Sequence, residues 1–373
     1  MWLRERLGTL DPVIVGLTFG LTIFGLVTLL SATGPAAMTR MGDSLYFVKH
    51  QLLTGVLPGL LGFCFFAFID FRRWKSFAPI ALFFSFVLLL LVYIPGIGVA
   101  YGGARGWVHF GPINFQPSEF VKLSFLIYLA AWLERRRGVE AHDPKTGLLP
   151  FLGVLGLVIL LLIMQPDTGS MAVIAGMSFI LYFLSGAPVI WFVGLCSAAV
   201  GLVLLLIKLS PYRAARFMTF LHPELDPLGI GYHINQAMLA IGSGGFWGLG
   251  YGNSRQKFLY LPEVEADSIF AIMAEEMGYW FCLALFLAFA ALVWRCFKIA
   301  KESDDRFGMF LAAGVGAWVG IQTMLNIGSM TGLVPMTGVT LPFISHGGSA
   351  LTMLLSAMGL VAGIPRKLAK RRV

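Results

Sequence analysis

Charged side chains are scarce in this sequence. Asp, Glu, Lys and Arg together make up 12% of the 373 residues, whereas 58% of the residues are hydrophobic. A soluble domain of this length could not bury so much apolar surface. Apolar runs such as residues 77–94 approach the roughly 20 residues that cross a bilayer as a helix. The composition therefore predicts an all-α polytopic membrane protein.

Several other signals are missing. None of the four cysteines forms a CxxC pair, which argues against a disulfide framework or a metal site. Neither GxxxxGK[ST] nor GxGxxG occurs in the Gly-rich stretch 231–257, so nucleotide binding is not indicated. The first apolar run ends without an A-x-A-like cleavage site, and we expect a retained helix. No internal repeat or soluble module is visible, and one transmembrane domain is expected over residues 1–373.

Ten apolar runs predict ten membrane spans, near residues 12–32, 48–69, 77–94, 117–133, 148–164, 169–185, 187–207, 268–294, 308–332 and 347–364. An even number places both termini on one side of the membrane. The loops on that side hold 18 of the 27 Lys and Arg residues, so the positive-inside rule predicts cytoplasmic termini. The net charge of +8 is then a topology signal, and nucleic acid is excluded as a partner.

The largest extracytoplasmic segment is predicted at residues 210–266, between the seventh and eighth spans. It is rich in glycine, aromatic and charged residues, so we expect function to lie in this loop and the membrane bundle. The stretch YLPEVEADSIFAIMAEEMG (260–278) closes the loop and opens the eighth span. It carries five carboxylates and no Lys or Arg: Glu263, Glu265, Asp267, Glu275 and Glu276.

Asp267 precedes the apolar run that begins at Ser268, which allows two interpretations. It could accept hydrogen bonds from the first free N–H groups as an N-cap. The same position would keep an ionised carboxylate at the aqueous rim, where a general base would have to stand. Glu275 and Glu276 lie about 12 Å deeper, at about 1.5 Å per residue. Acids inside a span usually face a cavity or a partner, and the sequence assigns these two no specific role.

Two other stretches place acids at helix starts. In FQPSEFVKLS (115–124), Pro117 suits a first helical turn, and Glu119 and Lys122 share one face at i, i+3. They could form a stabilising internal pair, or a cavity wall in which the cation meets an anionic head group. In MQPDTGSM (164–171), Asp167 is expected to cap the sixth span.

Two arginines, Arg213 and Arg216, share a face at the outer surface in SPYRAARF (210–217). They could extend toward lipid phosphates or recognise a pyrophosphate. The stretch 231–257 predicts a short amphipathic helix followed by a Gly-rich loop, in which glycines allow tight folding over a groove. Residues 338–352 predict a re-entrant loop, tolerated at membrane depth only when it lines a cavity or is buried in protein.

These motifs together resemble one family. QPSEFVKL, QPDTGS, YRAARF, GYHINQAMLAIGSGGFWGLGYGNSRQKFLYLPE, DSIFAIMAEE and LPFISHGGSAL occur in this order over residues 101–352. They closely resemble the SEDS family of FtsW, RodA and SpoVE proteins, and GNSRQKFLYLPE resembles its FtsW/SpoVE branch more than RodA. The chain departs from the commoner family patterns at Glu265, Ala266, Ser268 and His346, whereas Asp267 is retained.

The resemblance implies a peptidoglycan glycosyltransferase that polymerises lipid II at the outer face of the bacterial cytoplasmic membrane. It implies a class B penicillin-binding protein as transpeptidase partner, besides membrane lipids and the nascent glycan strand. The family's essential aspartate falls on Asp267, and conserved cavity residues fall on Glu119, Lys122 and Asp167. Gln236 and Glu263 are further candidates for the cavity.

The expected reaction is an inverting transfer in which Asp267 takes a proton from the attacking sugar hydroxyl. Cations would stabilise the departing undecaprenyl pyrophosphate, with Arg213 and Arg216 as first candidates and then Lys257 and Lys122. The sequence identifies no cofactor, and a divalent cation, Mg²⁺ or Mn²⁺, could assist at the pyrophosphate. Two other function classes stay open: a lipid II flippase or other transporter, and a catalytically idle scaffold.

Overall fold

The structure is a computed structural model that describes residues 10–101, 104–110, 113–136, 143–226 and 229–369. Within these ranges, ten helical segments coincide with the ten predicted spans. They are α2 (Pro12–Met41), α3 with α4 (Tyr46–Gln51 and Leu57–Phe68, joined by the π-helix Leu52–Val56), α5 (Trp74–Leu91), α6 (Pro117–Arg135), α8 (Leu149–Met164), α9 (Thr168–Leu184), α10 (Val189–Leu209), α13 (Ile269–Glu302), α14 (Arg306–Met330) and α15 (Gly348–Ala369).

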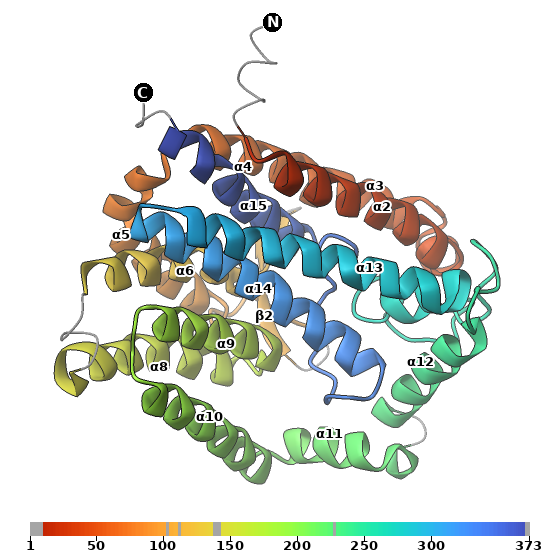
Figure 1. Cartoon of the computed structure of the whole chain (residues 1–373). Helices are drawn as coiled ribbons and strands as arrows, with labels where there is room; N and C mark the ends of the chain where they lie inside the picture. Colours follow the sequence, from red (N-terminus) through yellow and green to blue (C-terminus); the bar gives the residue numbers. More distant parts are fainter. Residues whose placement is uncertain (1–9, 102–103, 111–112, 137–142, 227–228, 370–373) are drawn as a thin grey trace, which may run out of the picture.

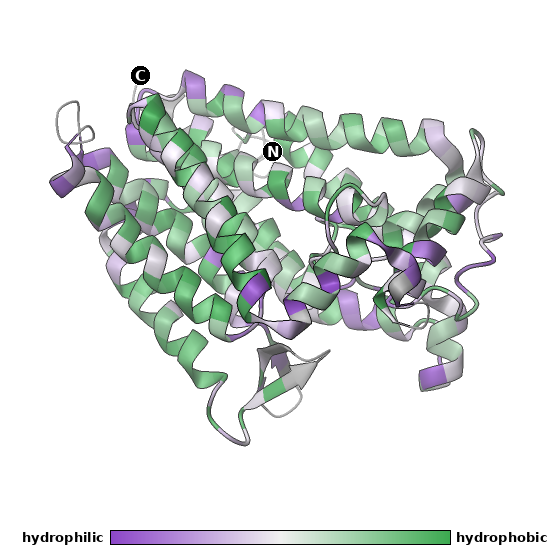
Figure 2. Ribbon diagram, turned by 90° about the horizontal axis from the view of Figure 1, so that it is seen from below, coloured by the Kyte–Doolittle hydropathy of each residue, from purple (hydrophilic) through white to green (hydrophobic). Residues whose placement is uncertain are grey.

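Eight of the helical segments in the described part of the chain are long and apolar enough to cross a membrane. Of the other two, α9 is apolar but has only 17 residues, and α6 carries Glu119 and Lys122 within its 19 residues. In Figure 2 the apolar residues cover the middle of the bundle, and hydrophilic residues gather toward its ends and in the loops. The predicted multi-pass helical membrane fold is confirmed.

Short polar or proline-containing signals set several helix starts. The Asp11 side chain accepts a hydrogen bond from the backbone of Ile14 at 3.0 Å and begins α2, with Pro12 in the first turn. Asp305 caps α14 in the same way through Gly308 at 3.1 Å. These bonds satisfy N–H groups that have no partner inside the helix.

Helices α14 and α15 form the centre of the bundle, because most of their residues are buried. Helix α14 packs against α13, α9 and α6, and α15 packs along α4. This arrangement matters for function because α14 carries polar side chains into the interior, at Gln322 and Asn326.

Helices α11 (Pro211–Leu221) and α12 (Ile230–Gly244) lie at the end of the bundle opposite the start of α2 (Figure 1). After α12, residues 245–268 run as turns against the start of α13. The backbone N–H of Leu249 donates to the carbonyl of Glu275 at 3.0 Å, and that of Tyr279 donates to Gly245 at 2.9 Å. Gly278 interrupts α13 with a φ of 76°, where a side chain would collide with the backbone of Gly248.

A three-stranded antiparallel sheet precedes α6 and was not predicted from the sequence. It consists of β1 (Gly98–Tyr101), β2 (Ala104–Phe110) and β3 (Ile113–Phe115) in that order. The strands are short and show no sustained alternation, so the neighbouring apolar runs dominate the sequence signal. The backbone carbonyl of Gln116, just after β3, accepts from the N–H of Glu119 at 3.2 Å, and its own N–H donates to the hydroxyl of Ser349 at 3.2 Å.

The predicted re-entrant segment before α15 is non-helical over residues 338–347, and its central residues 341–345 are buried in protein. Gly25 of α2 lies directly against the carbonyl of Phe343. Gln51 brackets the segment: its amide nitrogen donates to the carbonyl of Ser345 at 3.1 Å, and its amide oxygen accepts from Gly347 at 2.9 Å. Burial and these bonds explain how irregular backbone is accommodated inside the bundle.

Candidate active site

Asp267 lies in a tight turn immediately before α13. The backbone N–H groups of Ala266 and Ser268 both donate to the carbonyl of Glu263, at 3.1 and 3.2 Å. Glu263 adopts a φ of 49°, a left-handed conformation that is uncommon for a glutamate. Backbone strain of this kind is often found at functional sites.

The interpretation of Asp267 as an N-cap is wrong. Ser268 occupies the N-cap position of α13 and makes no side-chain cap hydrogen bond. Its hydroxyl is instead hydrogen-bonded to Nε2 of His233 on α12. Burial, with the positive charge of Arg216, lowers the pKa of His233 to about 4, so the imidazole is neutral at physiological pH. The Asp267 side chain is therefore not engaged as the cap of the helix that follows it.

The environment of Asp267 favours its protonated form more than the sequence suggested. Burial among protein atoms is the largest cause, the negative charge of Glu263 adds to it, and together they raise the pKa of Asp267 to about 7. The positive charge of Arg216 opposes this shift of the Asp267 pKa. Oδ1 of Asp267 is buried, and no donor among the described residues is within hydrogen-bonding distance. The expectation of a fully ionised carboxylate at neutral pH is corrected accordingly.

The backbone of Asp267 is fixed by a residue that sequence reasoning missed. The amide nitrogen of Asn326 donates to the carbonyl of Asp267 at 2.9 Å and to the carbonyl of Val339 at 2.8 Å. One turn earlier on α14, the amide nitrogen of Gln322 donates to the carbonyl of Thr340 at 3.0 Å. Polar residues at i, i+4 in an otherwise apolar span were the available signal.

The predicted pair on α6 is confirmed and is joined to the same network. Nζ of Lys122 lies 2.6 Å from Oε1 of Glu119, and both side chains are buried. Lys122 also donates to the amide oxygen of Gln322 at 3.3 Å, and Trp318 donates to that oxygen at 2.7 Å. The ion pair thus contacts Gln322, which lies one turn from the residue that holds Asp267.

Asp167 caps α9, as the sequence predicted, by accepting from the backbone N–H of Ser170 at 2.9 Å. Its Oδ2 atom is buried, with no partner among the residues that the structure describes. The hydroxyl of Ser170 donates to that of Ser118 on α6 at 3.3 Å, and Gly169 abuts the carbonyl of Thr337. Asp167 therefore begins its helix beside the α6 start and the segment that leads to Val339.

The two candidate arginines on α11 have different surroundings. Arg216 acts electrostatically on both Asp267 and His233. Arg213 instead donates from Nη2 to the carbonyl of Ile163 on α8 at 3.0 Å. The charge of Arg216 therefore acts on the Asp267 turn, whereas one guanidinium nitrogen of Arg213 is hydrogen-bonded to α8.

Lys257 is buried in an ion pair, with Nζ 2.9 Å from Oε1 of Glu276. Both oxygens of Glu276 also accept from the hydroxyl of Ser31 on α2, at 2.8 and 2.7 Å. Glu275 accepts from the hydroxyl of Ser254 and from the backbone N–H of Arg255. These two glutamates therefore fold the loop onto α13 and α2, a structural role that the sequence left unassigned.

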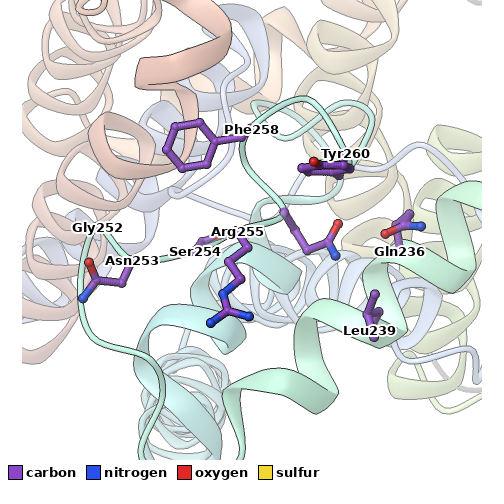
Figure 3. A pocket seen from close by; sticks show the side chains of 9 residues that line it. Gln236, Leu239, Gly252, Asn253, Ser254, Arg255, Phe258 and Tyr260 are labelled. Atoms are coloured by element: carbon purple, nitrogen blue, oxygen red, sulfur yellow. The ribbon is translucent and has the colours of Figure 1, made fainter.

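Gln236, on α12, lines a cavity of about 810 Å³ between this helix and the loop at residues 252–260 (Figure 3). Its helix also carries His233, whose Nε2 is hydrogen-bonded to the hydroxyl of Ser268, the residue after Asp267.

No cluster of three or more His, Cys, Asp or Glu side chains suited to a metal ion occurs in the described ranges. Glu265 pairs with Arg40 at 3.1 Å, while Glu263 is exposed as a residue but has its carboxyl group partly surrounded by protein. Burial and the charge of Glu265 raise the pKa of Glu263. His346, one of the departures from the commoner family patterns, packs against His50, and its Nε2 atom lies 3.1 Å from Nδ1 of His50. The backbone N–H of His346 donates to the carbonyl of Glu265 at 2.8 Å.

Comparison with known proteins shows which family the chain is similar to. A family model for FtsW, RodA and SpoVE proteins, described as "Cell cycle protein", matches residues 12–370. The chain is 39% identical to "Stage V sporulation protein E" of Bacillus subtilis (strain 168) over 361 residues, covering 95% of this chain and 97% of that protein. It is 38% identical to "Probable peptidoglycan glycosyltransferase FtsW" of Trichlorobacter lovleyi over 359 residues, covering 96% and 94%.

Solved structures of two proteins are also similar to this chain over nearly its whole length. One, described as "Structural coordination of polymerization and crosslinking by a peptidoglycan synthase complex", contains a similar chain with a TM-score of 0.77 and 29% identity, covering 96% of this chain and 98% of that one. The rod shape determining protein RodA of Thermus thermophilus has a TM-score of 0.69 and 27% identity, with 96% and 97% coverage. The chain therefore belongs to the FtsW/RodA/SpoVE family.

Proposed function

We propose that this chain is a peptidoglycan glycosyltransferase that polymerises lipid II into glycan strands. The relatives named as probable peptidoglycan glycosyltransferases support this activity, because the match extends over nearly the whole length of both chains. The observation that carries the mechanism is the carboxylate of Asp267, whose pKa is raised to about 7 beside Arg216. A group that titrates near the working pH is well suited to accept and release a proton.

In the proposed reaction, the 4-hydroxyl of an incoming lipid II attacks the anomeric carbon of the growing strand. Asp267 takes the hydroxyl proton as the new C–O bond forms. The bond from the anomeric carbon to the phosphate oxygen breaks, and undecaprenyl pyrophosphate leaves with the electron pair. The leaving group is already a good one, so one carboxylate suffices, unlike the acid–base pair of glycosidases.

Arg216 is the cation best placed to stabilise the leaving pyrophosphate, because its charge already acts on Asp267. Arg213 lies one turn away on α11 and would have to release the carbonyl of Ile163 to join it. Lys257 and Lys122 are held in buried ion pairs. We propose that they preserve the shape of the site, and that they are the less favoured candidates for contacting the phosphates.

A divalent cation, Mg²⁺ or Mn²⁺, would fit this chemistry only as an ion carried largely by the substrate. Mg²⁺ commonly binds through one or two carboxylates together with substrate phosphates. Glu263 is the exposed carboxylate beside Asp267 and could supply one such ligand. When bound, the ion would neutralise charge on the pyrophosphate.

A class B penicillin-binding protein is the proposed partner, because a structural relative was solved in a complex that couples polymerization and crosslinking. Both termini are proposed to be cytoplasmic on the basis of the basic loops. The Asp267 turn, α11 and α12 would then face the outer surface, where the lipid-linked substrate and the glycan strand are expected.

The rival candidates are a lipid II flippase and a catalytically idle scaffold. The decisive experiment incubates the purified protein with lipid II, alone and with its penicillin-binding protein, and resolves the products by length. The proposal predicts glycan polymers from the wild-type protein. Transport of labelled lipid II into proteoliposomes without any polymer would favour the flippase, and neither activity would favour the scaffold.

A further inference from the structure

The segment 245–251, hereafter the aromatic turn, follows α12 and exposes apolar surface. Its exposed large apolar side chains are Phe246, Trp247, Leu249 and Tyr251. Trp247 is 83% exposed, and the sequence from 227 to 254 contains no Asp, Glu, Lys or Arg. A contiguous exposed apolar patch marks a surface that contacts a membrane or another protein. The depth of the aromatic turn in the bundle distinguishes between these two partners.

A membrane boundary is marked by the ion pair of Asp11 with Arg295, at the start of α2 and near the end of α13. From this pair toward the other end of the bundle, residues 12–39 of α2 and residues 277–294 of α13 include no Asp, Glu, Lys or Arg. Charged residues are costly inside the hydrocarbon core. Distances along both helices can therefore be measured from the same boundary.

The contact of the aromatic turn with α2 gives its depth. The hydroxyl of Tyr251 donates to the carbonyl of Val27 at 2.7 Å. Val27 lies 16 residues after Asp11, which is about 24 Å at about 1.5 Å per residue. The hydrocarbon core of a bilayer is about 30 Å thick, so the Tyr251 hydroxyl lies about 6 Å inside the opposite boundary.

Helix α13 gives nearly the same depth. The chain after α12 turns back alongside the start of α13 (Figure 1), and the backbone N–H of Trp280 donates to the carbonyl of Phe246 at 3.4 Å. Trp280 lies 15 residues before Arg295, or about 22 Å at the same rise. Two independent helices thus place the aromatic turn within the thickness of the hydrocarbon core.

The backbone of the aromatic turn meets the condition that hydrocarbon imposes, namely that N–H and carbonyl groups find partners within the protein. The N–H of Leu249 donates to the carbonyl of Glu275 at 3.0 Å. The N–H of Gly250 donates to the carbonyl of Glu276 at 2.9 Å. The aromatic turn is therefore hydrogen-bonded to α13 through its backbone, and its apolar side chains are left exposed.

The exposed surface of the aromatic turn is continuous with the exposed surface of a membrane-spanning helix. The ring of Phe246 lies 6.0 Å from that of Tyr279 and 6.4 Å from that of Trp280, measured between centroids. Tyr279 and Trp280 are themselves exposed on α13. Because α13 is long and apolar enough to span the membrane, lipid is the partner that this surface shares with it.

We propose that the aromatic turn is inserted in the bilayer and that Phe246 and Trp247 contact the acyl chains of the lipids. The leaflet is the one opposite the start of α2, which is the outer leaflet in the proposed orientation. Aromatic side chains are favoured close to the boundary between hydrocarbon and head groups. Since the turn is hydrogen-bonded to α13, its insertion fixes the height of the start of that helix relative to the head groups.

The test measures the depth of position 247 in liposomes of phosphatidylethanolamine and phosphatidylglycerol. In the full chain the four cysteines are replaced by alanine, and Trp247→Cys carries a nitroxide label. The collision rate of the label with a water-soluble nickel chelate reports depth, because hydrocarbon excludes the polar chelate. Glu224→Cys is the reference for water, since the Glu224 side chain is 71% exposed at the outer end of the bundle. Ile23→Cys, at a 64% exposed position on α2, is the reference for lipid.

We expect the label at position 247 to collide with the chelate about tenfold less often than the label at position 224, and about as rarely as the label at position 23. Its collision rate with oxygen, which dissolves in lipid, should match that at position 23. A chelate collision rate equal to that at position 224 would overturn the proposal, because the turn would then lie in water. Low rates with both chelate and oxygen would also overturn it, because protein rather than lipid would then cover the surface.

A second variant tests the direction of the insertion. Phe258→Cys should show a chelate collision rate between those at positions 247 and 224. The reason is that the neighbouring Lys257 donates to the hydroxyl of Ser31, one turn further along α2 than Val27 and so closer to the head groups. A label at position 258 that lies deeper than the label at position 247 would contradict the inferred depth. Each labelled protein should elute from a sizing column as the wild type does, which confirms that it is folded.

Discussion

The side-chain amide of Asn326 donates a hydrogen bond of 2.9 Å to the backbone carbonyl of Asp267. The same nitrogen donates to the carbonyl of Val339 at 2.8 Å. A buried residue in the middle of the bundle thus holds together the turn that carries the proposed base and the non-helical segment before α15. The location of the Asp267 carboxylate depends on α14 as much as on its own helix.

We expect Asn326→Leu to slow polymerisation strongly without abolishing substrate binding. The variant leaves two carbonyls without a donor and frees the Asp267 turn, and a misplacement of about 1 Å can cost about 100-fold in rate. Steady-state kinetics with lipid II should show a lower kcat with little change in KM. Asn235→Leu is the control, because Asn235 is exposed on α12. An Asn326→Leu enzyme with the wild-type kcat would contradict the positioning role.

The rate of polymerisation should fall as the pH is lowered below about 7, which gives the pH–rate profile an acid limb there. Burial and Glu263 raise the pKa of Asp267 to about 7, and only the deprotonated carboxylate can accept a proton. The rate should therefore fall about tenfold for each pH unit below the pKa.

Two variants should move this limb in opposite directions. Glu263→Gln removes a negative charge, lowers the pKa of Asp267 and shifts the limb to lower pH. Arg216→Gln removes a positive charge and shifts it to higher pH. The profile is read from initial rates, with Glu302→Gln as the control at an exposed acid on the far end of α13. If the acid limb lay at the same pH in both variants, a group other than Asp267 would be responsible for it.

The buried Glu119–Lys122 ion pair should be essential for stability, because each charge compensates the other inside the protein. Glu119→Gln leaves the Lys122 ammonium buried without its counter-charge, which costs about 3–5 kcal/mol in comparable sites. Thermal unfolding in detergent should show a clearly lower Tm. The double variant Glu119→Gln/Lys122→Met should recover much of the loss, because no unpaired charge is left. A double variant no more stable than Glu119→Gln would contradict this account.

Local sequence rules predicted the helical spans and the pair on α6. Runs of apolar residues long enough to cross a bilayer have few structural alternatives, and a lysine inside such a run needs a near counter-charge. Asp167 was predicted as a helix cap for a similar reason, since the signal lies within one turn of the chain.

Contacts between distant segments were not predictable in this way. Ser268 is recruited by His233, 35 residues away, and this contact leaves Asp267 outside the helix cap. Glu276 is paired with a lysine from the preceding loop and with Ser31 of α2, and nothing in the local pattern distinguishes it from a catalytic acid. The burial that raises the pKa of Asp267 also comes from packing of separate elements rather than from its own neighbours alone.

The central claim is that the Asp267 carboxylate accepts the proton of the attacking hydroxyl. The most direct measurement is the initial rate of lipid II polymerisation by Asp267→Asn, a variant of nearly the same shape, at matched protein concentration. Asp43→Asn, at an exposed acid paired with Lys49, is the control and should retain the wild-type rate. We predict a loss of about 100- to 10,000-fold for Asp267→Asn, with a thermal unfolding midpoint close to that of the wild type. A correctly folded Asp267→Asn protein that polymerises lipid II at the wild-type rate would contradict the account.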